Sequence, residues 1–279
     1  MEILDGRKIK LEILNELKEK ISKLERRPGL VVIQVGSDPA SQVYVKQKAN
    51  MADIANIDFE HIKLDEGIEQ ETLLDIIYSL NRNSLVNGIL VQMPLPVQID
   101  AKVIQNAIDP LKDVDGLTDI NMGKLSHNVD SLVPCTPMGI IDMLKFYNID
   151  INGKCVTIVG RSDLVGKPLS CLMTNNNATT ILCHSKTNNL SDFTRMADIL
   201  VSAVGKPKFI TSDMVKDDSV VIDVGINRLD DGKLCGDIDY DNVKEKSSYI
   251  TPVPGGVGQM TVAELGKNTY KAYLLQKKK

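Results

Sequence analysis

The chain has 279 residues, of which 43% are hydrophobic, and its 33 Lys and Arg against 37 Asp and Glu give a formal charge of −4. This length predicts one large or two medium domains with real hydrophobic cores, and the apolar fraction excludes a disordered or fibrous chain. The slight net acidity argues against a nucleic-acid-binding protein, because phosphate binding needs a concentrated basic face.

The His and Cys residues and the lengths of the apolar runs argue against further classes of protein. The three His lie far apart and form no His-Glu-x-x-His frame, which argues against a zinc-dependent hydrolase, and no Gly-x-Ser-x-Gly elbow is present. Five Cys without a Cys-x-x-Cys pair favour reduced thiols in a cytosol over a zinc site or a disulfide framework. No run approaches the roughly 18 apolar residues of a membrane span, and residues 1–7 do not resemble a signal peptide. We therefore expect a cytoplasmic protein with no metal site and no membrane partner.

In chain order, the first predicted element is a helix whose apolar residues recur at spacings of three and four and which ends before Pro28. Its apolar positions are Leu14, Leu17, Ile21 and Leu24. Short apolar runs rich in β-branched residues then alternate with helix-like stretches. These runs predict strands at 30–35, 59–64, 88–92, 155–159, 180–183, 198–204 and 220–224. Such alternation is typical of parallel sheets covered on both faces, so the predicted fold class is α/β.

Two later helices are predicted from the residues that begin them. Thr136 is expected to cap a helix that has Pro137 at its first position. Thr261 and Glu264 form a Thr-x-x-Glu capping box, which predicts a last helix over residues 261–275. Both predictions depend on local capping signals alone.

The clearest chemical signal is the glycine turn Gly160–Pro168 (GRSDLVGKP), which directly follows the predicted strand 155–159 and leads into a helix. A glycine turn at this place lets backbone amides approach a pyrophosphate at the positive end of the helix. The pattern departs from Gly-x-Gly-x-x-Gly because Ser162 stands where the second glycine would be. An ordinary strand-to-helix turn is the alternative interpretation.

The residues after the next strand favour NADP over NAD as the nucleotide. An NAD site has an Asp or Glu about 20 residues after the turn, which binds the ribose 2′-hydroxyl, but residues 181–186 contain no carboxylate. Arg161, Ser185 and Lys186 could instead bind a 2′-phosphate, which a carboxylate would repel. A simple polar strand end would also explain Ser185 and Lys186.

A second constellation precedes the glycine turn. Ser41, Tyr44 and Lys48 are spaced to lie on one face of a helix that begins near Ser41. A tyrosine hydroxyl beside a lysine can handle protons, and burial would lower the lysine pKa from about 10.4 towards neutrality, whereas the alternative is a solvated helix face. Tyr-x-x-x-Lys is also the catalytic pair of short-chain dehydrogenases. There the pair follows the glycine turn, but Lys48 precedes Gly160 by 112 residues (160 − 48), so we set that interpretation aside.

Three further segments lie where strands are predicted to end, which is where α/β proteins bind ligands. Gln92 terminates a strand before two prolines and could point at a ligand. Asp113 and Asp115 are spaced to point the same way in an extended loop, but without a neighbouring His or third acid a metal site is disfavoured. The loop 251–259, with its prolines and glycines, suits close approach of the backbone to a flat ligand.

Taken in order, these segments resemble the bifunctional methylenetetrahydrofolate dehydrogenase/cyclohydrolase family. The matching segments are Ser41–Lys48 (SQVYVKQK), Gln92–Pro96 (QMPLP), Lys112–Thr118 (KDVDGLT), Pro134–Gly139 (PCTPMG), Gly160–Pro168 (GRSDLVGKP), Cys183–Thr187 (CHSKT) and Thr251–Thr261 (TPVPGGVGQMT). Seven collinear matches are very specific. One departure is Gln259, where family members commonly carry Pro, and we expect no loss of activity from it.

The resemblance implies an N-terminal three-layer α/β domain of residues 1–119 with 267–279, and a C-terminal Rossmann NADP-binding domain of residues 120–266. It implies folate in a cleft between these domains and a homodimer formed mainly through the Rossmann domains. The implied activity is oxidation of 5,10-methylenetetrahydrofolate with NADP, followed by hydrolysis of the methenyl product to 10-formyltetrahydrofolate. That reaction belongs to one-carbon metabolism, which serves purine, methionine and histidine biosynthesis.

Residue roles are also implied by the resemblance. Lys48 looks like the general acid/base, Tyr44 the residue that stacks on or near the folate ring, and Gln92 the partner that orients Lys48. Asp115 looks like the anchor of the pterin's amino edge. The implied NADP contacts are Gly160, Arg161, Ser162, Ser185 and Ile226, and the implied substrate loop contains Pro254 and Gly255.

Three alternatives to this function stay open. One is a related enzyme with only the dehydrogenase step, using NAD. The second is a non-catalytic nucleotide-binding regulator, which would have no reason to keep Tyr44, Lys48, Gln92 and Asp115 together. The third is a two-domain amino- or hydroxy-acid dehydrogenase, which would need groups to hold a small carboxylate.

Overall fold

The computed structural model describes residues 1–229 and 231–278, so Asp230 and Lys279, the last residue of the expected N-terminal domain, lie outside it. The chain divides into two compact units. The first unit comprises residues 1–10 and 136–261, and the second comprises residues 11–135 and 262–279. The unit boundaries fall inside α1 (Gly6–Ile21) and α10 (Val257–Lys277), and between the first two residues of α6 (Cys135–Phe146).

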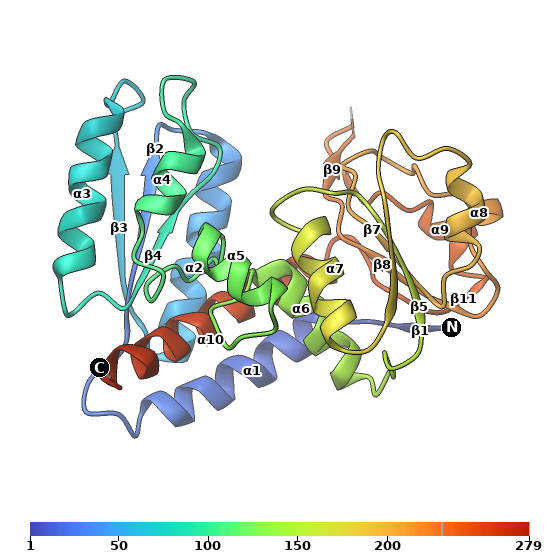
Figure 1. The fold of residues 1–279 in the computed structure, drawn as a ribbon, viewed down its shortest axis with the longest axis horizontal. Helices are drawn as coiled ribbons and strands as arrows, with labels where there is room; N and C mark the ends of the chain where they lie inside the picture. Colours follow the sequence, from blue (N-terminus) through green and yellow to red (C-terminus); the bar gives the residue numbers. More distant parts are fainter. Residues whose placement is uncertain (230, 279) are drawn as a thin grey trace. The chain divides into compact units, whose positions relative to one another are not determined.

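The first unit is built on a six-stranded parallel sheet, visible at the right of Figure 1. In spatial order its strands are β1 (Glu2–Ile3), β11 (Ser247–Ile250), β8 (Ser219–Asp223), β7 (Ile199–Ser202), β5 (Cys155–Val159) and β6 (Thr179–Cys183). The chain runs from β5 outwards to β6 and then returns to β7 on the other side of β5. This reversal is the topological switch point of a doubly wound fold, and ligands bind there at the carboxyl ends of the strands.

Short elements connect these strands. The connections contain α7 (Gly166–Asn175), α8 (Leu190–Thr194), the 3₁₀ helix η1 (Ser212–Met214) and α9 (Tyr240–Val243). A small antiparallel hairpin of β9 (Asn227–Arg228) and β10 (Leu234–Cys235) follows β8. Strand residues such as Val159, Leu200 and Val221 are buried in one apolar cluster, which explains why β5, β7 and β8 read as continuous apolar runs.

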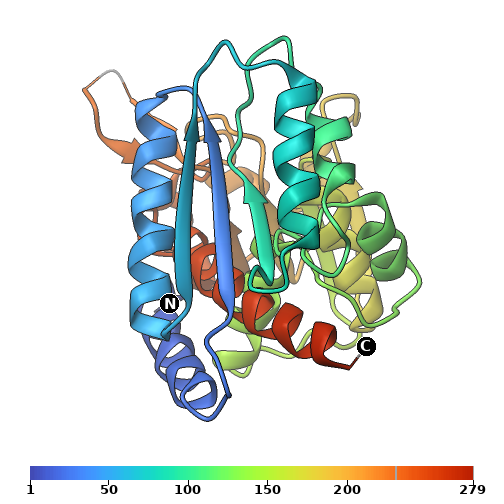
Figure 2. The ribbon, with the colours of Figure 1, turned by 90° about the vertical axis from the view of Figure 1, so that its left-hand side faces the viewer.

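The second unit is a three-layer sandwich around a parallel sheet in the order β3 (Asp58–Leu64), β2 (Gly29–Val35), β4 (Gly88–Val91). Alternate residues of β2 face opposite layers. Leu30 and Val32 pack with α1, α2 (Pro39–Ala55) and α10, whereas Val31, Ile33 and Val35 pack with α3 (Gln70–Arg82) and α4 (Ala101–Ala107). Figure 2 shows the three strands between α2 and α3. The predicted α/β fold class is therefore confirmed in both units.

Two predicted helix starts are wrong. The last helix begins at Val257 instead of Thr261, because the turn at Pro252–Gly256 already leads into it and Val257 is buried; the Thr261 hydroxyl donates to the Val257 carbonyl (3.4 Å) inside the helix. The helix expected from Thr136 begins at Cys135. Thr136 is therefore within its first turn, and its hydroxyl bonds to the Thr261 hydroxyl (2.8 Å).

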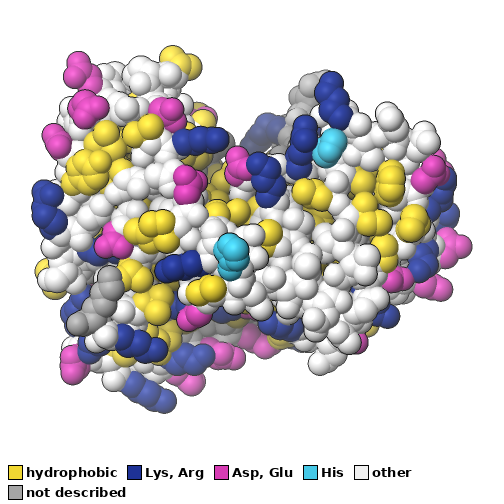
Figure 3. Space-filling model, viewed as in Figure 1, with side chains coloured by type: hydrophobic (Ala, Val, Ile, Leu, Met, Phe, Trp, Pro, Cys, Tyr) yellow, Lys and Arg dark blue, Asp and Glu magenta, His cyan; other side chains and the backbone are white. Residues whose placement is uncertain are grey.

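Residues 1–10 belong to the first unit because β1 pairs with β11, and residues 120–135 with α5 (Asp119–Ser126) belong to the second. Within the two described ranges, we find no helix with the length and apolarity that crossing a membrane requires. On the face shown in Figure 3, Lys and Arg side chains are interspersed with Asp and Glu.

Candidate functional site

Helix α2 positions the first group of predicted site residues in the second unit. Its start is set by Asp38, whose carboxylate accepts a hydrogen bond from the Ser41 amide (2.7 Å), and by Pro39 in the first turn. Tyr44 and Lys48 follow one turn apart on the same face of this helix. Tyr44 is 38% exposed, so it can contact a ligand, whereas Lys48 is partly buried.

Lys48 is held by Gln92, which lies directly after β4. The Lys48 Nζ donates to the Gln92 Oε1 at 2.7 Å. The other end of the amide is also fixed, because the Gln92 Nε2 donates to the Met93 carbonyl at 2.7 Å. The Gln92 backbone amide continues the ladder to the Ile33 carbonyl (2.8 Å), so the side chain projects from the carboxyl end of the sheet. This geometry gives the lysine one orientation and leaves its remaining protons for other partners.

The electrostatics of this group shift two pKa values. Burial lowers the pKa of Lys48, and the nearby charge of Asp115 only partly opposes that effect. Burial raises the pKa of Asp115, which the Lys48 charge partly offsets and the Asp113 charge reinforces. A lysine with a lowered pKa is neutral, and therefore basic, over a wider pH range than an exposed one.

Asp115 lies in a turn instead of the extended loop expected from the sequence. The Gly116 amide donates to the Asp113 carbonyl (3.0 Å), and Gly116 has φ +70°, with no room for a Cβ against the Val133–Pro134 backbone. The expectation of an extended loop is therefore wrong, and the two carboxyl groups have different partners. The buried Asp113 carboxylate accepts from the Thr118 amide (2.8 Å) and the Asn121 Nδ2 (2.9 Å), so it is a structural group.

Two residues that the sequence did not single out complete the surroundings of Asp115. The buried Cys135 thiol donates to the Val114 carbonyl (3.3 Å), and burial raises its pKa well above the usual value, so it stays protonated. The Asn268 Nδ2 donates to the carbonyls of Val114 (2.9 Å) and Val133 (2.8 Å). Cys135 lies in a recognised motif, but no local pattern indicated Asn268. We call Lys48, Gln92, Asp115 and Cys135 the Lys48 cluster.

The second group of predicted residues lies in the first unit, where β5 ends. Gly160 has φ +123°, its amide donates to the Cys183 carbonyl (2.9 Å), and a Cβ on it would collide with the Ala203 carbonyl. Gly166, the first residue of α7, packs so closely on the Gly160 carbonyl that it too has no room for a Cβ. This cradle of bare backbone at the start of a ten-residue helix fits a pyrophosphate.

Side chains predicted to contact the nucleotide follow neighbouring strands. Arg161 and Ser162 are exposed after β5, Ser185 is exposed after β6, and Ile226 is 46% exposed after β8. Because the sheet is parallel, all of these ends lie at one edge. Gly255, after β11, also follows this edge; it has φ +120° and accepts from the Gly6 amide (3.0 Å). Pro254 before it is exposed.

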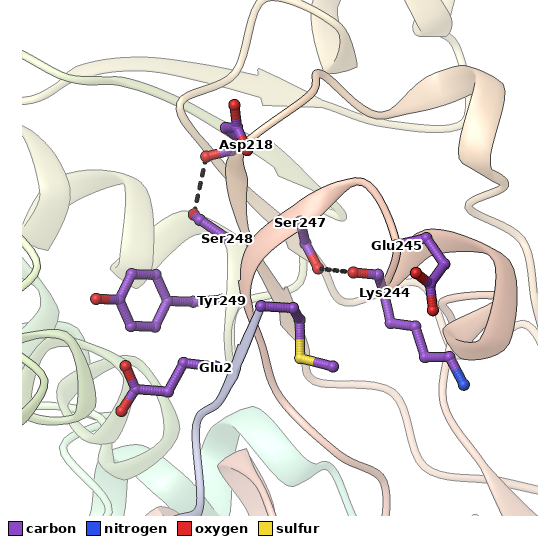
Figure 4. Close-up of a pocket in the computed structure, with 8 residues that line it drawn as sticks. Glu2, Asp218, Lys244, Glu245, Ser247, Ser248 and Tyr249 are labelled. Carbon is purple, nitrogen blue, oxygen red and sulfur yellow. Dashed lines mark hydrogen bonds between the residues drawn. The ribbon is translucent and has the colours of Figure 1, made fainter.

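A cavity of about 550 Å³ lies elsewhere in the first unit. It is lined by Met1, Glu2, Asp218, Lys244, Glu245, Ser247, Ser248 and Tyr249. Figure 4 shows these side chains where β1 and β11 begin, with hydrogen bonds from Ser248 to the Asp218 carbonyl (2.8 Å) and from Ser247 to the Lys244 carbonyl (3.1 Å). These are amino ends of strands, so the cavity is at the opposite edge from Gly160. In the part of the chain that the structure describes, no three His, Cys, Asp or Glu residues are grouped to hold a metal ion.

Comparisons with known proteins agree with this arrangement. Residues 4–115 match the family model "Tetrahydrofolate dehydrogenase/cyclohydrolase, catalytic domain", and residues 134–277 match the NAD(P)-binding domain of the same family. The bifunctional protein FolD of Aliarcobacter butzleri is 50% identical over 283 aligned positions, which cover 100% of this chain and 99% of that protein.

Solved structures give the same result. The FolD methylenetetrahydrofolate dehydrogenase/cyclohydrolase of Campylobacter jejuni superposes with a TM-score of 0.97 at 46% identity, covering 99% of both chains. The Trypanosoma brucei FolD, solved with NADP cofactor and inhibitor, has a TM-score of 0.95 at 35% identity and covers 99% of this chain and 98% of that one. Both the two-domain fold and the sequence are thus shared over the full length, and the chain belongs to the tetrahydrofolate dehydrogenase/cyclohydrolase family.

Proposed function

We propose that this protein oxidises 5,10-methylenetetrahydrofolate to 5,10-methenyltetrahydrofolate with NADP and then hydrolyses the product to 10-formyltetrahydrofolate, in one-carbon metabolism. Family membership over the whole chain supports both activities. The observation that carries the proposal is the 2.7 Å hydrogen bond between Lys48 and Gln92, which orients a lysine whose pKa burial has lowered.

The oxidation step needs alignment more than proton transfer. Bound NADP supplies the hydride acceptor. The bare backbone at Gly160 and Gly166 receives its pyrophosphate, and Ser162 is a further cofactor contact. Arg161, Ser185 and Lys186 bind the ribose 2′-phosphate. Ile226 contacts the cofactor, while Pro254 and Gly255 contact the folate. Since no carboxylate occurs at 181–186 to repel a 2′-phosphate, NADP is preferred over NAD.

The hydrolysis step uses the Lys48 cluster. Neutral Lys48 accepts one proton from the water that adds to the methenyl carbon, which gives a hydroxyl adduct, and it returns that proton to the ring nitrogen when the carbon–nitrogen bond breaks. The proton of the adduct hydroxyl is released to solvent as the formyl carbonyl forms. The cationic methenyl group itself disfavours a protonated lysine beside it. Gln92 keeps the amine oriented, the Tyr44 ring stacks on or near the folate ring, and Asp115 binds the amino edge of the pterin through charge-assisted hydrogen bonds.

A coupled assay tests this function. Purified protein is given methylenetetrahydrofolate with either NADP or NAD, and methenyl and 10-formyl products are followed separately. Conversion through to 10-formyltetrahydrofolate, faster with NADP, is the expected result. Accumulation of methenyl product with NAD would instead support the dehydrogenase-only alternative, and no turnover with either nucleotide would support the regulator.

We also propose a cytoplasmic homodimer that associates mainly through the first unit, which is the Rossmann domain. The family resemblance supports the assembly, and the five free cysteines suit a reducing compartment. Light scattering coupled to gel filtration should give twice the 30.7 kDa chain mass. A mass of one chain at micromolar concentration would contradict the dimer.

A further inference from the structure

Two buried carboxyl groups lie at the carboxyl edge of the six-stranded sheet, and none of the roles above uses them. Asp223 is the last residue of β8 and is 4% exposed, and Asp237, after β10, is fully buried. Within residues 1–229 and 231–278, neither forms an ion pair. Burying a carboxyl group without a cation is costly unless hydrogen bonds satisfy it, so the position of these donors indicates what the groups do.

The Asp237 carboxylate accepts hydrogen bonds from the loop that follows β7. It accepts from the amides of three consecutive residues, Val204 (2.7 Å), Gly205 (3.2 Å) and Lys206 (2.9 Å). The Ser202 hydroxyl (3.3 Å), at the end of β7, donates to the same group. One side chain therefore sets the backbone path of residues 202–206.

The same loop packs against the glycine turn at which the nucleotide is proposed to bind. Ala203, inside the loop, presents the carbonyl against which Gly160 packs without space for a Cβ. Asp237 also accepts from the Asn227 Nδ2 (3.0 Å), and Asn227 directly follows Ile226. The Asp237 carboxylate is thus hydrogen-bonded both to the loop that packs against Gly160 and to the residue that follows the exposed Ile226.

Asp223 in turn fixes Asp237. Its carboxyl group accepts from the amides of Gly225 (3.0 Å), Asp237 (2.9 Å) and Ile238 (2.9 Å). A Cβ on Gly225 would overlap the Asp237 carboxylate, and a Cβ on Gly236 would overlap the Asp223 carboxylate. Each carboxyl group therefore packs directly against a glycine backbone. Burial, reinforced by the Asp237 charge, raises the pKa of Asp223 to about 7. We call Asp223, Asp237 and these donors the Asp237 cluster.

We propose that Asp237 is a positioning residue for NADP, whose carboxylate holds the loop after β7 and the residue beside Ile226 in the shape that the nucleotide contacts require. Asp237 does not touch the cofactor, and it acts through Ala203 and Asn227. This inference rests on the proposed function, because Gly160 and Ile226 are cofactor contacts only if the protein uses NADP.

The Asp237→Asn variant tests the proposal. An amide would turn N–H donors towards amides that now donate to a carboxylate, so at least one of these hydrogen bonds is lost. Its matched control is Asp198→Asn at the amino end of β7, where Asp198 accepts from the Cys155 amide (2.9 Å) and Lys216 (2.6 Å). We measure the Kd of NADP by calorimetry, the KM for NADP in the dehydrogenase assay, and the cyclohydrolase rate on methenyltetrahydrofolate without nucleotide.

In Asp237→Asn, the Kd and KM for NADP should rise about tenfold or more, while the cyclohydrolase rate should stay within about twofold of wild type. Asp198→Asn should leave all three values unchanged. An unchanged Kd in folded Asp237→Asn, or an equal loss of both activities, would overturn the proposal. A wild-type protein that does not bind NADP would instead refute the proposed function.

A second variant keeps the test decisive if Asp237→Asn does not fold. Asn227→Ala removes one donor and leaves the carboxylate and its other four partners in place. Its Kd for NADP should rise about threefold with the cyclohydrolase rate unchanged. An Asn227→Ala protein with wild-type NADP affinity would contradict the proposal, because Asn227 is the described link from Asp237 to Ile226.

Discussion

The Lys48 cluster and the Asp237 cluster each contain a carboxyl group that is at least half-buried, but the surroundings of the two groups differ. Asp115 is half-buried and feels the charge of Lys48, whereas Asp237 is fully buried and accepts hydrogen bonds from three consecutive backbone amides. Backbone donors fix loops and leave nothing for a ligand. A group that meets a substrate keeps some of its hydrogen-bonding capacity unused, and the comparison therefore separates a site of chemistry from a site of positioning.

Loss of the lysine should have the largest effect. Lys48→Met should lower the cyclohydrolase rate by about a hundredfold or more, since general acid–base groups contribute roughly 10²–10⁴. NADP affinity, measured by calorimetry, should not change. Lys46→Met is the control, because Lys46 is exposed on the same helix two residues away and should point elsewhere. Full cyclohydrolase activity in Lys48→Met would show that the Lys48 cluster is not the proton-transfer site.

The next largest effect is expected on NADP binding alone. Gly160→Ala should raise the KM for NADP by tens of times, because the methyl group meets the Ala203 carbonyl and φ +123° is strained for alanine. Gly153→Ala, at φ +73° with open space around its Cβ, reports backbone strain without the collision. Cyclohydrolase assayed without nucleotide should survive both changes. Equal NADP affinities in the two variants would mean that the close approach at Gly160 is unimportant.

A smaller effect should distinguish the side-chain amides of Asn268 and Gln276, which both lie on α10. Asn268→Ala leaves the Val114 and Val133 carbonyls without this donor, which should cost about 1–3 kcal/mol in the free energy of unfolding. It should also raise the KM for folate several-fold, because Val114 precedes Asp115.

Gln276→Ala is the matched control for this prediction. Its Nε2 bridges the carbonyls of Asn87 and Leu111 (both 2.9 Å) in the same way, two turns further along the helix. Urea unfolding should show similar losses of stability for both variants, but only Asn268→Ala should change the KM for folate. A similar KM change in Gln276→Ala would mean that general loosening of the helix, and not the Asp115 turn, is responsible.

The smallest effect is a pH dependence of stability. The Asp223 pKa is about 7 in the folded protein and 3.8 as the ordinary reference, so between these values the folded state binds the extra proton. The contribution is therefore full below pH 3.8 and is lost as the pH rises through 7, with about 1 kcal/mol lost between pH 6 and pH 7. Urea unfolding of Asp223→Asn over this range should lack that decline. An unchanged slope in the variant would show that Asp223 does not titrate there.

Much of the fold could be predicted because its signals are local. Alternating apolar runs and helical periodicity depend on neighbouring residues, and they identified an α/β protein and the seven predicted strands. The two-residue strand β1 and the β9–β10 hairpin were missed because such short segments have no periodicity of their own. Strand β11 was missed because its sequence, SSYI, contains no apolar run. The starts of α6 and α10 were misplaced because burial and the preceding turn, not capping alone, set them.

The sequence by itself determined which residue types are available: a lysine one turn after a tyrosine, a glycine turn after a strand, and no carboxylate to exclude a 2′-phosphate. Only the tertiary structure decided their partners. Strand order places Gln92 beside Lys48 across 44 residues, and α10 brings Asn268 to Val114 across 154. The hairpin returns Asp237 to Asp223. Hydrogen bonds and burial act over a few ångströms regardless of sequence separation, so pKa shifts and positioning groups emerge only when the chain has folded.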